Sequence, residues 1–112
     1  MSDILKQLDK VLEARKAESA DSSYVASLYN KGTEKILKKV AEEAAETVMA
    51  AKDLDHHNTT ENQEHLVYEI ADLWFHTMVL LASQNLSSED VTRELQRRFG
   101  LSGHDEKASR TE

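Results

Sequence analysis

The sequence predicts an all-α protein, a helical bundle of four to five helices. Three observations carry this prediction. The 112 residues include no proline and only three glycines, so the chain lacks the turn residues that β-sandwiches and barrels need. Alanine, leucine, glutamate and lysine, which are strong helix formers, are abundant. Apolar residues also recur at helical spacing in successive stretches of the chain.

The length of the chain predicts one domain, which we expect to cover residues 1–100. A chain of 112 residues is small for a self-sufficient core, so oligomerisation is expected. Residues 101–112 show no helical period and are expected to form a flexible C-terminal tail.

Two shorter helices are expected before residue 33. Apolar residues at helical spacing predict the first from Asp3 to about Ser19, with Ser2 or Asp3 as its cap. A second, brief helix begins at Tyr24 and is closed by the Asn-Lys-Gly run that ends at Gly32. A glycine at this point suits a left-handed C-terminal cap, although it could instead let the backbone approach a ligand.

Two long helices are expected next. Thr33 can cap the first of them, which runs to about Asp55. A polar loop around residues 55–62 follows, and we interpret its adjacent histidines at 56 and 57 as solvated. The second long helix runs from about Thr60 to Ser83 and is apolar nearly all round, which is typical of a central helix in a bundle.

The last predicted helix begins after Ser87, which caps it, with Asp90 placed as in a capping box. Val91, Leu95 and Phe99 form its apolar face. Its arginines lie in or near the last turn, where they complement the helix dipole.

Charge and cysteine content exclude several classes of protein. A formal net charge of −7 argues against nucleic-acid binding through a broad basic face. The absence of cysteine excludes a disulfide scaffold and a thiolate metal site, and it fits a cytoplasmic location. The first residues do not resemble a signal peptide, and no apolar stretch of about 18 residues suggests a membrane span.

Two acidic pairs, Glu43 with Glu46 and Glu69 with Asp72, share an i, i+3 spacing within helical segments. Residues three apart lie on one side of a helix, so two such helices packed together could direct four carboxylates to one point. Crowded carboxylates need a cation, and oxygen ligands favour Mg²⁺ or Mn²⁺. Di-iron bundles use Glu-x-x-His motifs, and the sequence contains none.

The two pairs differ in what else they could be. The first pair could form surface ion pairs with Lys35 and Lys39, each worth a few tenths of a kcal/mol. The helix that carries the second pair is apolar nearly all round. Burying two carboxylates there would cost several kcal/mol each, unless they are paired or bind metal.

Three lysines and one histidine accompany the acidic pairs. Lys35, Lys38 and Lys39 precede the first pair and could meet a phosphate as point charges. His76 follows the second pair by one helical turn. It could orient a ligand, contact a phosphate, or be a satisfied group in the core.

Most of the chain, from Ser23 to about Gly100, resembles the phosphoribosyl-ATP pyrophosphohydrolase family of the all-α nucleoside triphosphate pyrophosphatase (MazG-like) superfamily. The most specific segment is the Lys-Gly-Thr-x-Lys-Ile run at residues 31–36, followed by Glu-Glu-x-x-Glu at residues 42–46. The segments at residues 69–76 and 86–91 also match. The acidic pairs alone are typical of the superfamily rather than of this family.

The resemblance implies hydrolysis of 1-(5-phosphoribosyl)-ATP to 1-(5-phosphoribosyl)-AMP and pyrophosphate, the second step of histidine biosynthesis, in a bundle completed by a second subunit. It implies Mg²⁺ ligands and a base among the acidic residues, and phosphate contacts among the basic ones. The implied metal ligands are Glu43, Glu46, Glu69 and Asp72, with Glu42 as a candidate for water activation or a second metal contact, and Lys35, Lys38 and Lys39 for the phosphates. Many members carry a fused cyclohydrolase domain; nothing upstream of Asp3 could be that domain, so the activity is expected to stand alone.

Two other readings of the sequence stay open at this point. The same chemistry could act on another nucleotide, as in a housekeeping (d)NTP pyrophosphatase. The chain could also be a non-enzymatic helical interaction module whose charges form surface ion pairs. The buried setting of Glu69 and Asp72 favours the enzyme over the module.

Overall fold

The structure is a computed structural model that describes residues 3–99, and within this range the chain forms five α-helices, a short 3-10 helix and no strand. The predicted all-α class is therefore confirmed, while the predicted tail at residues 101–112 lies outside the described residues. The elements are α1 (Ile4–Ala14), the 3-10 helix η1 (Arg15–Ala17), α2 (Tyr24–Lys31), α3 (Thr33–His56), α4 (Thr60–Ser83) and α5 (Ser88–Phe99).

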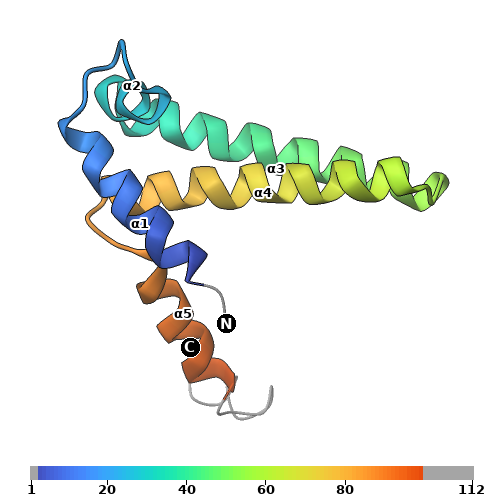
Figure 1. Ribbon diagram of the computed structural model, residues 1–112. Helices are drawn as coiled ribbons and strands as arrows, with labels where there is room; N and C mark the ends of the chain where they lie inside the picture. Colours follow the sequence, from blue (N-terminus) through green and yellow to red (C-terminus); the bar gives the residue numbers. More distant parts are fainter. Residues whose placement is uncertain (1–2, 100–112) are drawn as a thin grey trace.

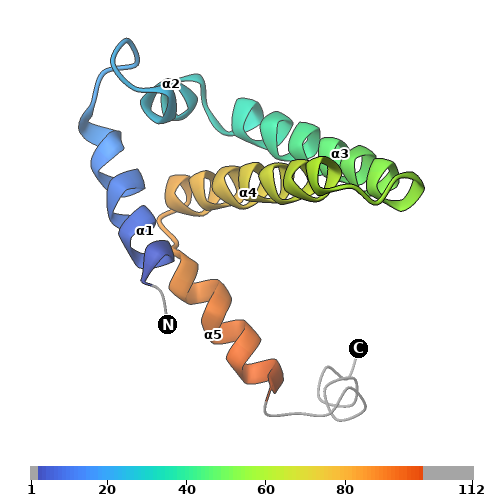
Figure 2. The same ribbon diagram turned by 45° about the vertical axis from the view of Figure 1, so that its right-hand side comes forward.

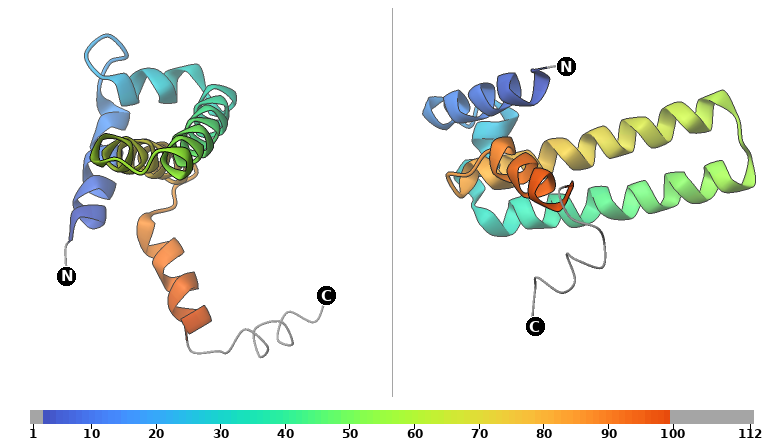
Figure 3. Two further views of the ribbon diagram at one scale, coloured as in Figure 1. Left: turned by 90° about the vertical axis from the view of Figure 1, so that its right-hand side faces the viewer. Right: turned by 90° about the horizontal axis from the view of Figure 1, so that it is seen from below.

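A long antiparallel hairpin of α3 and α4 dominates the molecule (Figure 1). The helices α1 and α2 lie across one end of this hairpin, where α3 begins and α4 ends, and α5 points away from it (Figure 2). The other end of the hairpin extends beyond the remaining helices, as the right-hand view in Figure 3 shows. The hairpin is thus covered by the chain along only part of its length.

The hydrophobic core lies at the covered end of the hairpin. Leu12 of α1, Leu28 of α2, Ile36 of α3 and Val79 of α4 are the large side chains that are almost completely buried. The hydroxyl of Tyr29 donates a hydrogen bond to the carbonyl of Leu12 at 2.9 Å and ties α2 to α1. Towards the far end the hairpin leaves large apolar side chains exposed, namely Val48, Met49, Val67 and Tyr68.

Side-chain caps fix several helix ends. Ser23 accepts a hydrogen bond from the backbone N–H of Ala26 at 3.1 Å, and Thr59 accepts one from Asn62 at 3.1 Å. The predicted capping contact of Asp90 is confirmed, because its carboxylate accepts from the N–H of Ser87 at 2.9 Å. That hydrogen bond is the main cause that lowers the pKa of Asp90.

A second carboxylate at the start of α5 comes from a distant part of the chain. Asp9 of α1 accepts from the N–H of Ser88 at 3.0 Å and from its hydroxyl at 2.6 Å. Ser88 is buried, so water does not supply a partner for its backbone N–H at the start of α5. The carboxylate of Asp9 accepts that hydrogen bond instead. The contact fixes where α5 begins relative to α1.

Three predicted boundaries are wrong. The first α-helix ends at Ala14, and η1 replaces its expected last turn. Thr33 is the first residue of α3 rather than its cap, because Gly32 ends α2 and begins α3 with φ 99° and ψ 176°. The φ of Gly32 is positive, but its ψ differs from that of the left-handed cap that we predicted. Only residues 57–59 separate α3 from α4, so the polar loop is shorter than expected.

By length and composition alone, α4 could span a membrane. The sequence had indicated no such stretch. The helix carries the buried side chains of Glu69 and His76 in its middle and packs along α3. We therefore interpret α4 as the central helix of the bundle.

Candidate metal centre

The packing of α3 on α4 brings three carboxylates together. Glu43 of α3 and Glu69 and Asp72 of α4 each offer one oxygen, and these oxygens all lie within 4.8 Å of one another. Glu43 and Glu69 are buried and Asp72 is half-buried. The structure thus brings together three of the four metal ligands that the acidic pairs had suggested.

The fourth predicted ligand, Glu46, lies outside this group. It is exposed one helical turn beyond Glu43 on α3, close enough for its charge to raise the pKa of Glu43. Glu42 is also exposed, and its carboxylate lies 3.4 Å from the ammonium of Lys39. Glu42 and Glu46 therefore flank the three clustered carboxylates on the side that faces solvent.

The clustered carboxylates are not satisfied by the protein alone. Oε1 of Glu43 and Oε1 of Glu69 are buried and have no hydrogen-bond partner among the described residues. Burial is the largest cause that raises the pKa of Glu43, followed by the charges of Glu46 and Asp72, and Lys39 acts in the opposite direction. Buried oxygens without partners in a negative field suit a divalent cation with oxygen ligands, so the residues present fit Mg²⁺ or Mn²⁺.

The three predicted phosphate-binding lysines have different surroundings. Lys39 is half-buried, and its ammonium lies 3.5 Å from Oε2 of Glu43 as well as near Glu42. Burial alone would lower the pKa of Lys39, but Tyr24 and these two carboxylates raise it. Lys35 lies one turn earlier on the same side of α3, and neither it nor the exposed Lys38 forms an ion pair within residues 3–99.

His76 lies one helical turn after Asp72 on α4, and both of its ring nitrogens form hydrogen bonds. Its Nδ1 is 2.8 Å from the carbonyl of Asp72, and its Nε2 is 2.9 Å from the hydroxyl of Tyr24. A carbonyl only accepts, so Nδ1 carries a proton and donates to the carbonyl of Asp72; in a singly protonated ring, Nε2 then accepts from the hydroxyl of Tyr24. His76 is buried and satisfied, as one of our alternatives proposed, and its phosphate contact stays a prediction.

Sequence reasoning missed two residues beside the cluster. Tyr24 reaches it from α2, and burial, together with three nearby carboxylates, raises the pKa of its phenol. Nothing in the sequence predicts this long-range contact. His65 lies on α4 with its Nε2 3.0 Å from Oε2 of Glu69. The i, i+4 spacing of His65 and Glu69 could have revealed this contact.

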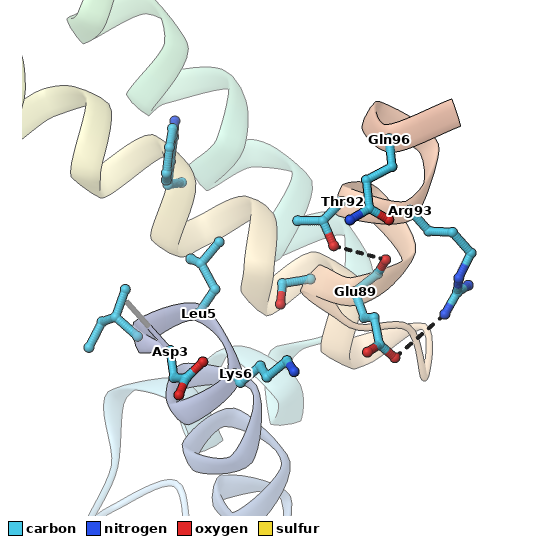
Figure 4. Close-up of a pocket in the computed structure, with 10 residues that line it drawn as sticks. Asp3, Leu5, Lys6, Glu89, Thr92, Arg93 and Gln96 are labelled. Carbon is cyan, nitrogen blue, oxygen red and sulfur yellow. Dashed lines mark hydrogen bonds and ion pairs between the residues drawn. The ribbon is translucent and has the colours of Figure 1, made fainter. Parts of the chain in front are cut away.

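A large groove among the described residues lies elsewhere. It has a volume of about 720 Å³ and is formed by the start of α1, Trp74 of α4 and the first turns of α5. Figure 4 shows Asp3, Lys6 and Arg93 at its rim. None of the predicted site residues lines this groove, so the acidic cluster, and not the groove, is the candidate site.

The fold and the site together define an all-helical protein with a carboxylate cluster held between two antiparallel helices. The sequence profile of the family described as "Phosphoribosyl-ATP pyrophosphohydrolase" matches residues 5–99. The chain therefore belongs to the phosphoribosyl-ATP pyrophosphohydrolase family.

Individual relatives agree with this assignment over nearly their whole length. A protein of Hydrogenovibrio crunogenus named phosphoribosyl-ATP pyrophosphatase is 67% identical over 110 residues, which cover 98% of this chain and 95% of the relative. A protein of the same name from Chromobacterium violaceum is 60% identical over 108 residues, covering 96% and 94%. Another from Vesicomyosocius okutanii is 54% identical over 110 residues, covering 98% of each.

Proposed function

We propose that this protein hydrolyses 1-(5-phosphoribosyl)-ATP to 1-(5-phosphoribosyl)-AMP and pyrophosphate, the second step of histidine biosynthesis, with Mg²⁺ at the acidic cluster. The observation that carries the proposal is the meeting of Glu43, Glu69 and Asp72, with two buried oxygens that have no hydrogen-bond partner within residues 3–99. Family membership and the names of the relatives support the substrate.

The chain's own residues would divide the work. Glu43, Glu69 and Asp72 would hold the cation, and Glu46, one turn away, would join them on the solvent side. When bound, Mg²⁺ (or Mn²⁺) would neutralise phosphate oxygens and lower the pKa of the attacking water. The exposed Glu42, adjacent to Glu43 on α3, would be the candidate to accept the proton of that water.

The lysines of α3 would position the polyphosphate. Lys35 and Lys39 lie one turn apart on one side of the helix, and Lys39 is next to the cluster. Lys39 already neutralises part of the acidic field, since it lies 3.4 Å from Glu42 and 3.5 Å from Glu43. A bound phosphate would compete for this ammonium, and Lys38 would add charge from solvent.

The direct test is an assay of the purified protein with phosphoribosyl-ATP and Mg²⁺, with and without chelator. We expect turnover that the chelator abolishes. Glu69→Gln should lower turnover more than about 100-fold, because even partners of metal ligands are worth 10–100-fold. Glu64→Gln is the matched control, since Glu64 is exposed on the same helix and has no ion pair within residues 3–99. Full activity of Glu69→Gln would refute the proposed site.

Two alternatives are decided by the same preparation. Equal or faster turnover of canonical dNTPs would favour a housekeeping (d)NTP pyrophosphatase over the phosphoribosyl substrate. A helical interaction module would show no turnover of either, and Mg²⁺ would not raise its melting temperature. The unsatisfied buried carboxylate oxygens favour the enzyme over the module.

We also propose that the protein is a cytoplasmic homodimer or higher homo-oligomer. The far half of the hairpin exposes Val48, Met49, Val67 and Tyr68, and a second copy of the chain packed on this half would bury them. Sedimentation velocity should give at least a dimer, and Val67→Glu should shift it towards monomer. A monomeric wild-type protein would refute this assembly, and recovery of the protein in a membrane fraction would refute the location.

A further inference from the structure

Each of the two buried glutamates has one oxygen held by a residue four positions earlier in the same helix. On α3, Oε2 of Glu43 lies 3.5 Å from the ammonium of Lys39. On α4, Oε2 of Glu69 lies 3.0 Å from Nε2 of His65. In both glutamates the remaining oxygen, Oε1, is buried and has no hydrogen-bond partner in the part of the chain that the structure describes.

We propose that His65 is a positioning residue that holds Glu69 so that its free oxygen faces the acidic cluster. This inference rests on the proposed metal site. In the neutral ring, Nε2–H can donate to Oε2 of Glu69, which leaves Oε1 for a cation. A fixed second oxygen reduces the rotamer freedom that Glu69 loses when the cation binds.

The geometry argues for an orienting contact rather than for a fourth ligand. His65 is not part of the group whose ligand atoms lie within 4.8 Å of one another. Its Nε2 already contacts Glu69, and half of its side chain is exposed, whereas only 11% of the Glu69 side chain is. The histidine therefore lies on the solvent side of a buried ligand, where it can fix the carboxylate and shield it from water.

His65 also differs from Lys39 in what it can specify. An ammonium is a charge without a preferred direction, whereas an imidazole N–H donates along one line. The contact on α4 thus selects one orientation of the carboxylate, while the contact on α3 mainly offsets charge. A substitution that keeps a directed N–H should preserve the function of His65, and one that removes it should not.

The test compares His65→Ala and His65→Gln with the wild type, with His56→Ala as the matched control. The amide N–H₂ of glutamine can reach the position of Nε2, so the glutamine variant keeps the donor. His56 is exposed in the last turn of α3 and makes no side-chain hydrogen bond or ion pair within residues 3–99. The full-length proteins are titrated with MnCl₂ alone by calorimetry at one pH, and they are melted in EDTA.

We expect His65→Ala to weaken Mn²⁺ binding by about 10-fold, the low end for partners of metal ligands. His65→Gln and His56→Ala should bind like the wild type. In EDTA, His65→Gln and His56→Ala should melt like the wild type. His65→Ala should melt only slightly lower, because it loses one hydrogen bond to Glu69 and no part of the core. In turnover assays, His65→Ala should need more Mg²⁺ but approach the wild-type rate at saturating Mg²⁺.

Two results would overturn the inference while leaving the metal site intact. One is unchanged Mn²⁺ affinity in His65→Ala, and the other is an equal loss in His65→Gln. The inference would also be overturned if His65→Ala melted in EDTA at so much lower a temperature that unfolding accounted for its loss of Mn²⁺ affinity. A structural role would then suffice. If the wild type itself binds no Mn²⁺, the proposed site fails, and the two failures are thereby distinguishable.

Discussion

Neutralising Glu43 should stabilise the metal-free protein. Glu43 faces the carboxylates of Glu69 and Asp72 within 4.8 Å, and two unit charges at that distance repel by about 3 kcal/mol at an effective dielectric of 20. The attraction to the ammonium of Lys39, at 3.5 Å, offsets most of the sum of the two repulsions. Glu43→Gln keeps the shape of the side chain. It removes the repulsions, the attraction to Lys39 and the cost of burying the charge of Glu43.

The net expectation is a gain of about 1–2 kcal/mol at neutral pH, or a rise in Tm of roughly 5–10 °C for a domain of this size. Adding Mg²⁺ should reverse the order. The wild type gains stability by binding the cation, in proportion to the logarithm of its concentration above Kd. The variant lacks one ligand and should gain less.

The assay is thermal unfolding followed by circular dichroism, in EDTA and across a series of Mg²⁺ concentrations. Glu42→Gln is the matched control, because Glu42 is the adjacent glutamate, also pairs with Lys39 and is exposed. It should change stability by less than about 0.5 kcal/mol. A destabilised Glu43→Gln in EDTA, or a Mg²⁺ response equal to that of the wild type, would refute the reasoning.

Three further predictions follow from other contacts. The raised pKa of Glu43 means that the folded state binds this proton more tightly than the unfolded state. The contribution of Glu43 to metal-free stability is therefore fully present below its ordinary pKa of 4.5 and is lost as pH rises through the folded pKa. pH-dependent urea denaturation of the wild type and of Glu43→Gln should differ by this slope. Asp9→Ala removes the acceptor for both the N–H and the hydroxyl of Ser88 and should cost about 1–2 kcal/mol in the same measurement; a neutral effect would contradict the capping role. Gly32→Ala meets no atom within 4 Å at its new Cβ, so its cost should come from the positive φ alone, about 1–3 kcal/mol, and a stabilised variant would be contrary to this account.

Local signals explain why so much of the fold could be predicted. The apolar periodicity of α3 and α4 and the capping box of Ser87 and Asp90 depend on residues within a few positions of each other. The structure has these features. The acidic cluster was also within reach, because an i, i+3 pair on each of two helices limits where their carboxylates can meet.

The missed features depend on depth and on contacts between distant residues. Glu46 has the spacing of a ligand, but it lies a turn further along α3 at the surface, and spacing does not give depth. Thr33 looked like a cap because its hydroxyl is suitable, yet the backbone of Gly32 determines where α3 begins. The contacts of Tyr24 with His76 and of Asp9 with Ser88 join helices far apart in sequence, where periodicity carries no information.

The hairpin has a consequence for the order of folding. All three clustered carboxylates lie on α3 and α4, which only residues 57–59 separate. Closing so short a connection costs little entropy, and local contacts form early. Like charges would therefore meet while the hairpin forms, before α1 and α5 are needed, so the concentration of divalent cations should affect the rate of folding as well as the final stability.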